Sequence, residues 1–179
     1  QRCDLGPSDV MFVLHMTHLL SPDQIDDIKR TFSSIISQSV VQMVRVGVIT
    51  YDDSQDARYA LHLGKVTTLE QTERAIMQLA PAPCPLSFCK FDPTKTLAHG
   101  VDMAQAVLDG ESGGARMKKI VVVHTGRTRP GEAETVQERM ATDPWLRIAQ
   151  VHVEREDGEN PGEQYSEYLD SYYQPYERY

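Results

Sequence analysis

The sequence predicts an α/β domain with three layers: a doubly wound, mostly parallel sheet with one antiparallel edge strand and helices on both faces. Strand-like and helix-like segments alternate along the chain, which favours parallel strands joined by helices. Two short apolar runs, 10–14 and 120–123, are typical of strands buried inside such a sheet. Two other strand-like segments, 43–51 and 58–63, are separated only by a polar turn at 52–56, which predicts a hairpin and hence the antiparallel edge strand.

Length and composition predict one globular domain that spans residues 1–179. A chain of 179 residues is long enough to bury a sizeable core. No apolar run approaches the roughly 20 residues of a membrane-spanning helix, so we expect no membrane insertion. The net charge of −8, without a cluster of basic residues, opposes binding to nucleic acid. The first residue, Gln1, is not an initiator Met, which is typical of a mature protein or a fragment.

Three helices are marked by their first residues and by their apolar spacing. A capping box at 21–24 opens a helix that we expect to run to about Ser37, and a second capping box at 68–71 opens another. The third helix is expected from about Thr96 until the glycine-rich turn at 110–114. By helical spacing, the core-facing residues are Ile25, Ile28, Phe32, Ile35 and Ile36 in the first helix, Leu69, Ile76 and Leu79 in the second, and Leu97, Val101, Ala104 and Leu108 in the third.

The remaining pattern predicts a strand at 119–123, a short helix at 132–140 and a strand at 146–153. The segment 154–179 that follows is acidic and rich in tyrosine, and Tyr165, Tyr168 and Tyr172 share one helical face. We expect this segment to form an amphipathic helix whose tyrosines pack on the sheet. The alternative is an exposed segment used for association, sulfation or crosslinking.

The three cysteines predict one disulfide. Cys84 and Cys89 are too widely spaced for a C-x-x-C motif and lie in a proline-rich loop at 80–93, where we expect them to pair with each other. Two free thiols are the alternative, because disulfides are rare in cytosolic chains. Cys3 is then unpaired or available to another chain.

Polar residues follow the two apolar strands, at the position where open α/β sheets bind their ligands. These strand ends carry imidazoles, hydroxyls and a guanidinium but no carboxylate, which restricts the ligands that they suit. The residues are His15, Thr17 and His18 after the first strand, and His124, Thr125 and Arg127 after the second.

Four phrases in this order resemble the von Willebrand factor type A domain over about residues 3–153. They are SDVMFVL at 8–14, VRVGVITY at 44–51, TKTLA at 94–98 and KIVVVHTGR at 119–127. The similarity is greatest to the extracellular-matrix members of the family, as in collagen VI chains and matrilins. The resemblance implies a secreted module of the extracellular matrix that acts in cell adhesion or assembly. Its expected partners are proteins such as collagens or other type A domains, and it is a candidate for homo-oligomer formation.

Members of that family usually hold a divalent ion at a metal-ion-dependent adhesion site. On the family pattern, the loop Asp falls on His15, the two loop serines fall on Thr17 and Leu19, and the distant Thr and Asp fall on Thr94 and Thr125. Both carboxylates are therefore replaced. Because Mg²⁺ and Ca²⁺ require oxygen ligands, including anionic ones, we expect a degenerate site without metal, and no cofactor.

Other uses of the same region stay open. His15, His18 and His124 could converge on a zinc ion, or act as a pH switch between about pH 5 and 7. Arg127 and Arg129 form a basic loop on which an anionic group of a partner could dock.

The motifs of nucleotide-binding enzymes and α/β-hydrolases are not found: the chain has no G-x-G-x-x-G turn after the first strand, no phosphate-binding loop and no G-x-S-x-G elbow. We therefore expect a non-catalytic protein–protein interaction or assembly module rather than an enzyme. Two alternatives remain. One is a self-assembling structural protein that is crosslinked through Cys3 or the tyrosine-rich segment, and the other is a His-based metal- or pH-responsive binding module.

Overall fold

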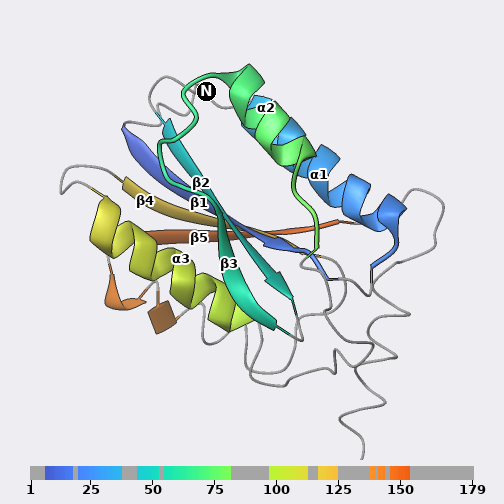
Figure 1. Cartoon of the computed structure of the whole chain (residues 1–179). Helices are drawn as coiled ribbons and strands as arrows, with labels where there is room; N and C mark the ends of the chain where they lie inside the picture. Colours follow the sequence, from blue (N-terminus) through green and yellow to red (C-terminus); the bar gives the residue numbers. More distant parts are fainter. Residues whose placement is uncertain are drawn as a thin grey trace, which may run out of the picture.

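The computed structural model of the chain has a central sheet with helices on both faces (Figure 1). It describes residues 7–17, 20–37, 44–52, 55–81, 97–112, 117–124, 138–139, 141–143 and 146–153, with the backbone alone at 55, 56, 124 and 152. The described part contains the strands β1 (Ser8–His15), β2 (Val44–Asp52), β3 (Gln55–Leu61), β4 (Met117–His124) and β5 (Leu146–His152), and the helices α1 (Pro22–Ser37), α2 (Leu69–Met77) and α3 (Leu97–Glu111).

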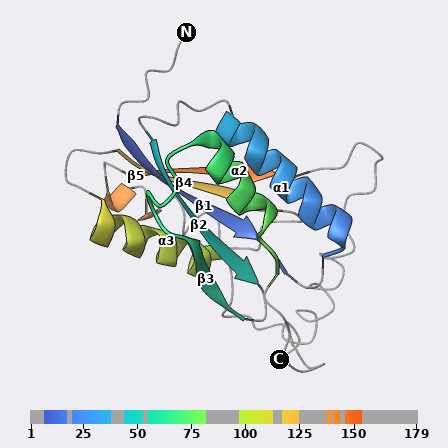
Figure 2. The same ribbon diagram turned by 45° about the horizontal axis from the view of Figure 1, so that its top comes forward.

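The sheet has the strand order β3-β2-β1-β4-β5. β1 pairs in parallel with β2 and β4, and β5 pairs in parallel with β4; among the described strands, only β3 is antiparallel to its neighbour, β2. Helices α1 and α2 lie on one face, called here the α1 side, and α3 lies on the other, called the α3 side (Figures 1 and 2). The predicted fold class is confirmed.

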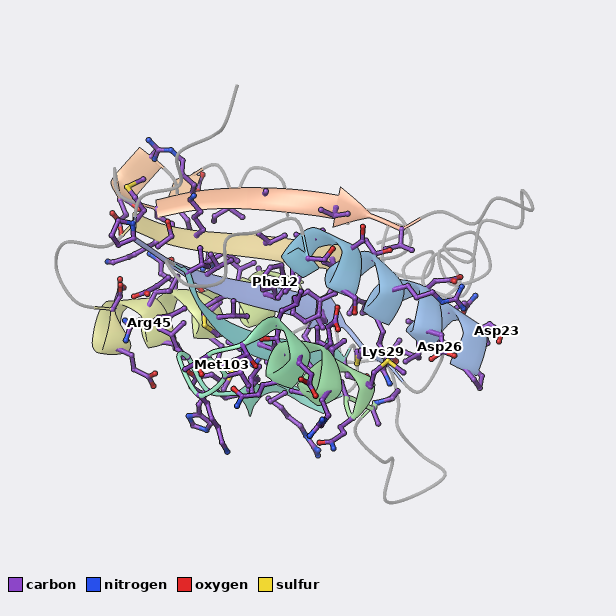
Figure 3. All side chains as sticks on the ribbon, turned by 90° about the horizontal axis from the view of Figure 1, so that it is seen from above. Phe12, Asp23, Asp26, Lys29, Arg45 and Met103 are labelled. Atoms are coloured by element: carbon purple, nitrogen blue, oxygen red, sulfur yellow. The ribbon has the colours of Figure 1, made fainter. Side chains whose placement is uncertain are left out.

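β1 lies in the centre of the sheet and is buried on both faces. Because successive strand residues point to opposite faces, Val10, Phe12 and Leu14 pack on the α1 side, while Met11 and Val13 pack on the α3 side. Phe12 lies between β1 and α1 (Figure 3), with its ring centroid 4.3 Å from that of Phe32. The apolar run at 10–14 is therefore a fully buried strand, as its composition predicts.

α1 begins at the predicted capping box. The backbone N–H of Ser21 donates to Gln24 Oε1 at 2.8 Å, and the N–H of Gln24 donates to Ser21 Oγ at 3.3 Å, which satisfies two N–H groups that the helix itself cannot pair. Lys29 Nζ donates to the carbonyl of Met77 at 3.2 Å and so links α1 to the end of α2. Of the predicted core residues in α1, Ile25, Ile28, Phe32 and Ile36 are buried, and Ile35 is partly buried.

α2 differs in detail from the prediction. Thr68 caps the helix by accepting from the N–H of Gln71, but the Gln71 side chain accepts from the N–H of Thr67 rather than from that of Thr68. Ile76 is buried as predicted, whereas Leu69 and Leu79 are only partly buried. Thr72 is fully buried instead, which is possible because its hydroxyl donates to the carbonyl of Thr68 at 2.9 Å.

α3 begins at Leu97 and contains all four predicted core residues, which are buried. The helix ends at Glu111, within the range 110–114 expected to end it, although Gly110 and Glu111 are themselves helical. A helical glycine costs about 1 kcal/mol relative to alanine. Contacts around the end of the helix offset this cost: Tyr59 Oη donates to Glu111 Oε2 at 3.0 Å and Lys118 Nζ donates to Asp109 at 2.8 Å.

The β2–β3 hairpin is tighter than predicted. β2 continues to Asp52 and β3 begins at Gln55, and these two residues are paired, so both strands extend into the range 52–56 that was expected to be a turn. The polar side chains of this region suggested a longer turn. However, the hydrogen bonds between the two strands are made by backbone N–H and C=O groups, which residues with polar side chains also carry. The edge strand is antiparallel, as expected.

An ion pair between a buried carboxylate and a partly exposed guanidinium, which the sequence did not predict, joins β1, β2 and the end of α3. Asp9 is fully buried, and its two carboxylate oxygens accept from Arg45 Nε at 2.8 Å and Nη2 at 2.6 Å. Ser112 Oγ also donates to Asp9 Oδ2, at 2.6 Å. Hydrogen bonding to this carboxylate is the main reason that the pKa of Arg45 is raised.

Some predictions lie partly or wholly outside the described residues. Of the helix expected at 132–140, residues 138–139 are described and are helical. The proline-rich loop is described only at 80–81, and the segment 154–179 lies outside the description. No helix among the described residues is long and apolar enough to cross a membrane.

Candidate functional site

The carboxyl ends of four neighbouring strands place four aromatic or imidazole residues in one row. His15 of β1 is in register with Tyr51 of β2. Because Leu14 is in register with Val123, the next residues, His15 and His124, are neighbours, and His124 is in register with His152 of β5. The sequence pattern indicated His15 and His124 at this edge of the sheet but not His152, because only the strand register reveals the place of His152.

His15 is a packed core residue rather than an open ligand. Its side chain is only 2% exposed, and its ring stacks on that of Tyr51 with 4.8 Å between centroids and 21° between planes. The N–H of Met16 donates to the carbonyl of Tyr51 at 3.0 Å, which extends the contact between the two strands beyond the end of β1. His15 therefore lies at the strand end where ligands are expected, but its side chain is buried.

Thr17 and the end of β2 are also buried. Thr17 has no exposed surface, and its carbonyl accepts from the N–H of Leu20 at 3.1 Å, which closes a turn before α1. At the end of β2, Thr50 and Asp52 are 9% and 3% exposed. Asp52 thus places a buried carboxylate near this end of the sheet. Its burial does not follow from the sequence pattern, in which Asp52 belongs to the polar turn expected at 52–56.

These groups do not suit a hard divalent cation. Of the residues expected at metal positions from the resemblance, the structure describes two: His15 offers an imidazole and Thr17 a hydroxyl, whereas Mg²⁺ and Ca²⁺ bind through several oxygens, some of them anionic. Among the described residues, no group of three or more His, Cys, Asp or Glu side chains is arranged to hold a metal ion.

Most of the other predicted site residues lie outside the described residues, so their convergence remains a prediction. They are His18, Leu19, Thr94, Thr125, Arg127 and Arg129, the disulfide candidates Cys84 and Cys89, and Cys3. His124 is placed only by its backbone at the end of β4.

Neither a family model nor a curated protein sequence matches the chain. Solved structures do. Proximal thread matrix protein 1 from the mussel byssus aligns with 13% identity and a TM-score of 0.63 over 82% of this chain, which spans only 38% of the mussel chain. Another structure of that mussel protein, with the same identity and TM-score, has a zinc-occupied MIDAS motif, the metal-ion-dependent adhesion site.

Two other structures match over most of their own length. The SpRpn10 VWA domain has 14% identity and a TM-score of 0.60, with 81% of this chain and 74% of that one covered. The conserved hypothetical protein BatB from Bacteroides thetaiotaomicron has 15% identity and a TM-score of 0.59, with 86% and 73% covered. Together with the mostly parallel sheet and its one antiparallel strand, these matches show that the chain has the von Willebrand factor type A fold.

Proposed function

We propose that this domain is a non-catalytic, extracellular protein–protein interaction or assembly module that works without a bound Mg²⁺ or Ca²⁺. The observation that supports the proposal is the buried stack of His15 on Tyr51, because the resemblance assigns His15 to the position of the family's first metal-binding carboxylate.

A metal-bridged contact needs an ion with an open coordination position and anionic protein ligands that hold it. A 2% exposed imidazole packed against an aromatic ring supplies neither an anionic oxygen nor an approach for a partner. Partner binding at this end of the sheet is therefore expected to use direct protein contacts. Arg127 and Arg129 are the candidates for such contacts, since guanidinium groups pair bidentately with carboxylates.

The proposed location and partners rest on two likenesses. The strand phrases resemble those of matrix members of the family, and one structural neighbour is a matrix protein of the mussel byssus. On this basis, the proposed partners are matrix proteins such as collagens, other type A domains or a second copy of the chain.

Surface plasmon resonance over immobilised collagen VI tests the proposal. We expect saturable binding whose affinity is equal in EDTA and in MgCl₂. In the double variant Arg127→Ala with Arg129→Ala, the affinity should fall about tenfold, because one or two charge-assisted contacts are lost. The control is Arg30→Ala with Arg74→Ala, which removes the same charge from side chains that are 76% and 71% exposed on α1 and α2. Binding that EDTA abolishes would contradict the proposal.

A second candidate, a His-based metal- or pH-responsive module, is favoured by the register that brings His15, His124 and His152 to one level of the sheet. Calorimetric titration with Zn²⁺ tests it. This candidate predicts zinc binding that is lost in His152→Ala and kept in His62→Ala, an exposed histidine beyond the end of β3. The absence of zinc binding in the unmodified chain excludes the zinc form of this candidate.

A further inference from the structure

A cleft of about 460 Å³ lies on the α1 side of the sheet, between α2 and the strands β2 and β3. Its floor is apolar, because it is formed by Val48, Leu61 and Ile76, which are 0%, 8% and 1% exposed. Seven of the ten lining residues are apolar, and none is acidic. Clefts of this volume that combine apolar walls with a few polar groups are typical binding sites for small molecules.

Two alanines keep the cleft open. The pairing of β3 with β2 shifts between Tyr59 and Leu61, so Ala60 is an extra residue in the edge strand and forms a β-bulge. Ala60 and Leu61 consequently line the cleft together, although successive residues of a regular strand point to opposite faces. Ala75 lines the cleft from α2. Because both alanine side chains end at Cβ, a larger side chain at either position would occupy part of the cleft.

Two polar side chains line the cleft near the beginning of α2. The N–H of Lys65 donates to the carbonyl of His62 at 3.1 Å and closes a turn after β3, in which Gly64 has a φ of 75°. Gln71 Oε1 accepts from the N–H of Thr67 at 3.0 Å, which leaves the Nε2 group of Gln71 to donate elsewhere. Lys65 and Gln71 are both exposed, so they lie at the mouth of the cleft rather than at its buried floor.

We propose that this cleft binds a small amphipathic carboxylate, whose hydrocarbon part lies on the apolar floor and whose carboxylate contacts Lys65 and Gln71 Nε2. The lining favours an anion: the chain has a net charge of −8, yet the cleft is lined by a lysine and by no acidic residue. Within the described part of the chain, Lys65 forms no ion pair that the ligand would have to replace. An ammonium group donates charge-assisted hydrogen bonds to a carboxylate, and the positive end of the α2 dipole lies at the same end of the cleft.

The dimensions of the cleft limit the ligand. Gln71 and Gln78 both line the cleft, and their separation in α2 corresponds to about 10 Å along the helix axis. At about 30 Å³ for each water molecule, the volume of the cleft equals that of roughly fifteen waters. The ligand is therefore an elongated molecule of about ten to fifteen non-hydrogen atoms. Decanoate is a probe of this size.

Calorimetric titration of the full chain with decanoate at about pH 7.5, where the probe is ionised, tests the site. We expect saturable binding with a dissociation constant below about 1 mM. Decyltrimethylammonium, which has a similar alkyl chain and the opposite charge, should bind at least about tenfold more weakly. Lys65→Met keeps the length of the side chain and should weaken decanoate binding about tenfold without weakening that of decyltrimethylammonium. The matched control, Lys119→Met on β4, should change both affinities by less than about twofold.

Filling the cleft provides a second test. Ala75→Leu should weaken decanoate binding at least about tenfold, because the added side chain occupies the space of the ligand. Ala60→Leu should have the same effect from the opposite wall, so the test does not depend on one variant being folded. The control is Ala106→Leu, which makes the same change at an exposed position of α3, on the other face of the sheet, and should leave the affinity within about twofold.

Three outcomes would overturn the proposal: no saturable binding of decanoate to the unmodified chain, equal affinities for the two probes, or equal losses of affinity in Ala75→Leu and Ala106→Leu. A fourth outcome concerns a different occupant. If decanoate does not bind but Ala75→Leu weakens the binding of collagen VI in surface plasmon resonance, the cleft holds a side chain of a protein partner, and the proposal is wrong.

Discussion

At the scale of single residues, the defining feature is that His15 combines a position at a strand end with the burial of a core residue. Its 2% exposure and its stacking on Tyr51 mean that the imidazole stabilises the sheet rather than facing a ligand. A substitution of His15 should therefore change the free energy of unfolding more than it changes the binding of a partner.

Replacing His15 by the family's residue tests this. His15→Asp places a carboxylate without a metal in a buried aromatic stack, and we expect it to lower the free energy of unfolding by roughly 2–4 kcal/mol. His15→Phe keeps a ring against Tyr51 and should cost less than about 1.5 kcal/mol. Urea denaturation compares the two. Equal losses of unfolding free energy in the two variants would mean that the stacking of His15 on Tyr51 does not stabilise the fold.

The Asp9–Arg45 pair predicts an asymmetry between its two partners. Asp9 is fully buried, whereas the Arg45 side chain is 39% exposed. Arg45→Ala removes the cationic partner of a buried carboxylate to which Ser112 still donates, and should cost about 3–5 kcal/mol. Asp9→Ala leaves a guanidinium that water can reach and should cost less. Denaturant unfolding of both variants measures the difference, and a larger loss for Asp9→Ala would contradict the description of the pair.

At the scale of elements, the position of α3 depends on a glycine that lies against the sheet. A Cβ at Gly100 would come within 2.9 Å of Val13 Cγ1 and 3.3 Å of Tyr51 Cβ, so the helix approaches β1 and β2 more closely than any side chain would allow. A Cβ at Gly110, in the same helix, would meet no atom within 4 Å. The two glycines therefore have different roles.

We expect Gly100→Ala to destabilise the protein by about 1–3 kcal/mol, because overpacking outweighs the gain in helix propensity. Gly110→Ala should instead stabilise it by up to about 1 kcal/mol, because it adds propensity without a clash. Thermal denaturation of both variants provides the comparison. If Gly100→Ala and Gly110→Ala shifted the midpoint of thermal unfolding in the same direction, the close packing of α3 on the sheet would be refuted.

At the scale of the whole molecule, charged and titrating groups connect α3 to the sheet. Lys118 of β4 donates to Asp109 of α3 at 2.8 Å, and this hydrogen bond is the main cause of its raised pKa. Tyr59 of β3 has a pKa raised mainly by burial, and its hydroxyl accepts from the N–H of Leu63 at 2.7 Å while donating to Glu111.

Both shifts predict a loss of stability at alkaline pH. A group whose pKa is higher in the folded state than in the unfolded state stabilises the fold below its unfolded pKa, here near 10.0 for Tyr59 and 10.5 for Lys118. That stabilisation is lost as the pH rises through the folded pKa. The free energy of unfolding should therefore fall above about pH 10, and less steeply in Tyr59→Phe with Lys118→Met. Urea unfolding between pH 8 and 11.5 measures both slopes, and identical slopes would contradict the assignment.

The sequence predicted the fold well because each buried element carries its own periodic signal. The apolar run of β1, the capping box of α1 and the four core residues of α3 are local patterns, and all three were found as predicted. The burial of His15, the row that includes His152 and the Asp9–Arg45 pair depend on register between distant segments. Asp9 and Arg45 are 36 residues apart in the chain, so no local pattern reveals their contact.

We propose that this type A fold works without a divalent ion, and calorimetric titration of the full chain with Mg²⁺ and Ca²⁺ tests the proposal. We predict no heat of binding beyond dilution up to about 10 mM, well above the dissociation constants of extracellular calcium modules. The variant that restores the family's loop and distant carboxylate, His15→Asp with Leu19→Ser and Thr125→Asp, should gain a saturable response. Saturable millimolar or tighter binding of either ion to the unmodified chain would contradict the claim.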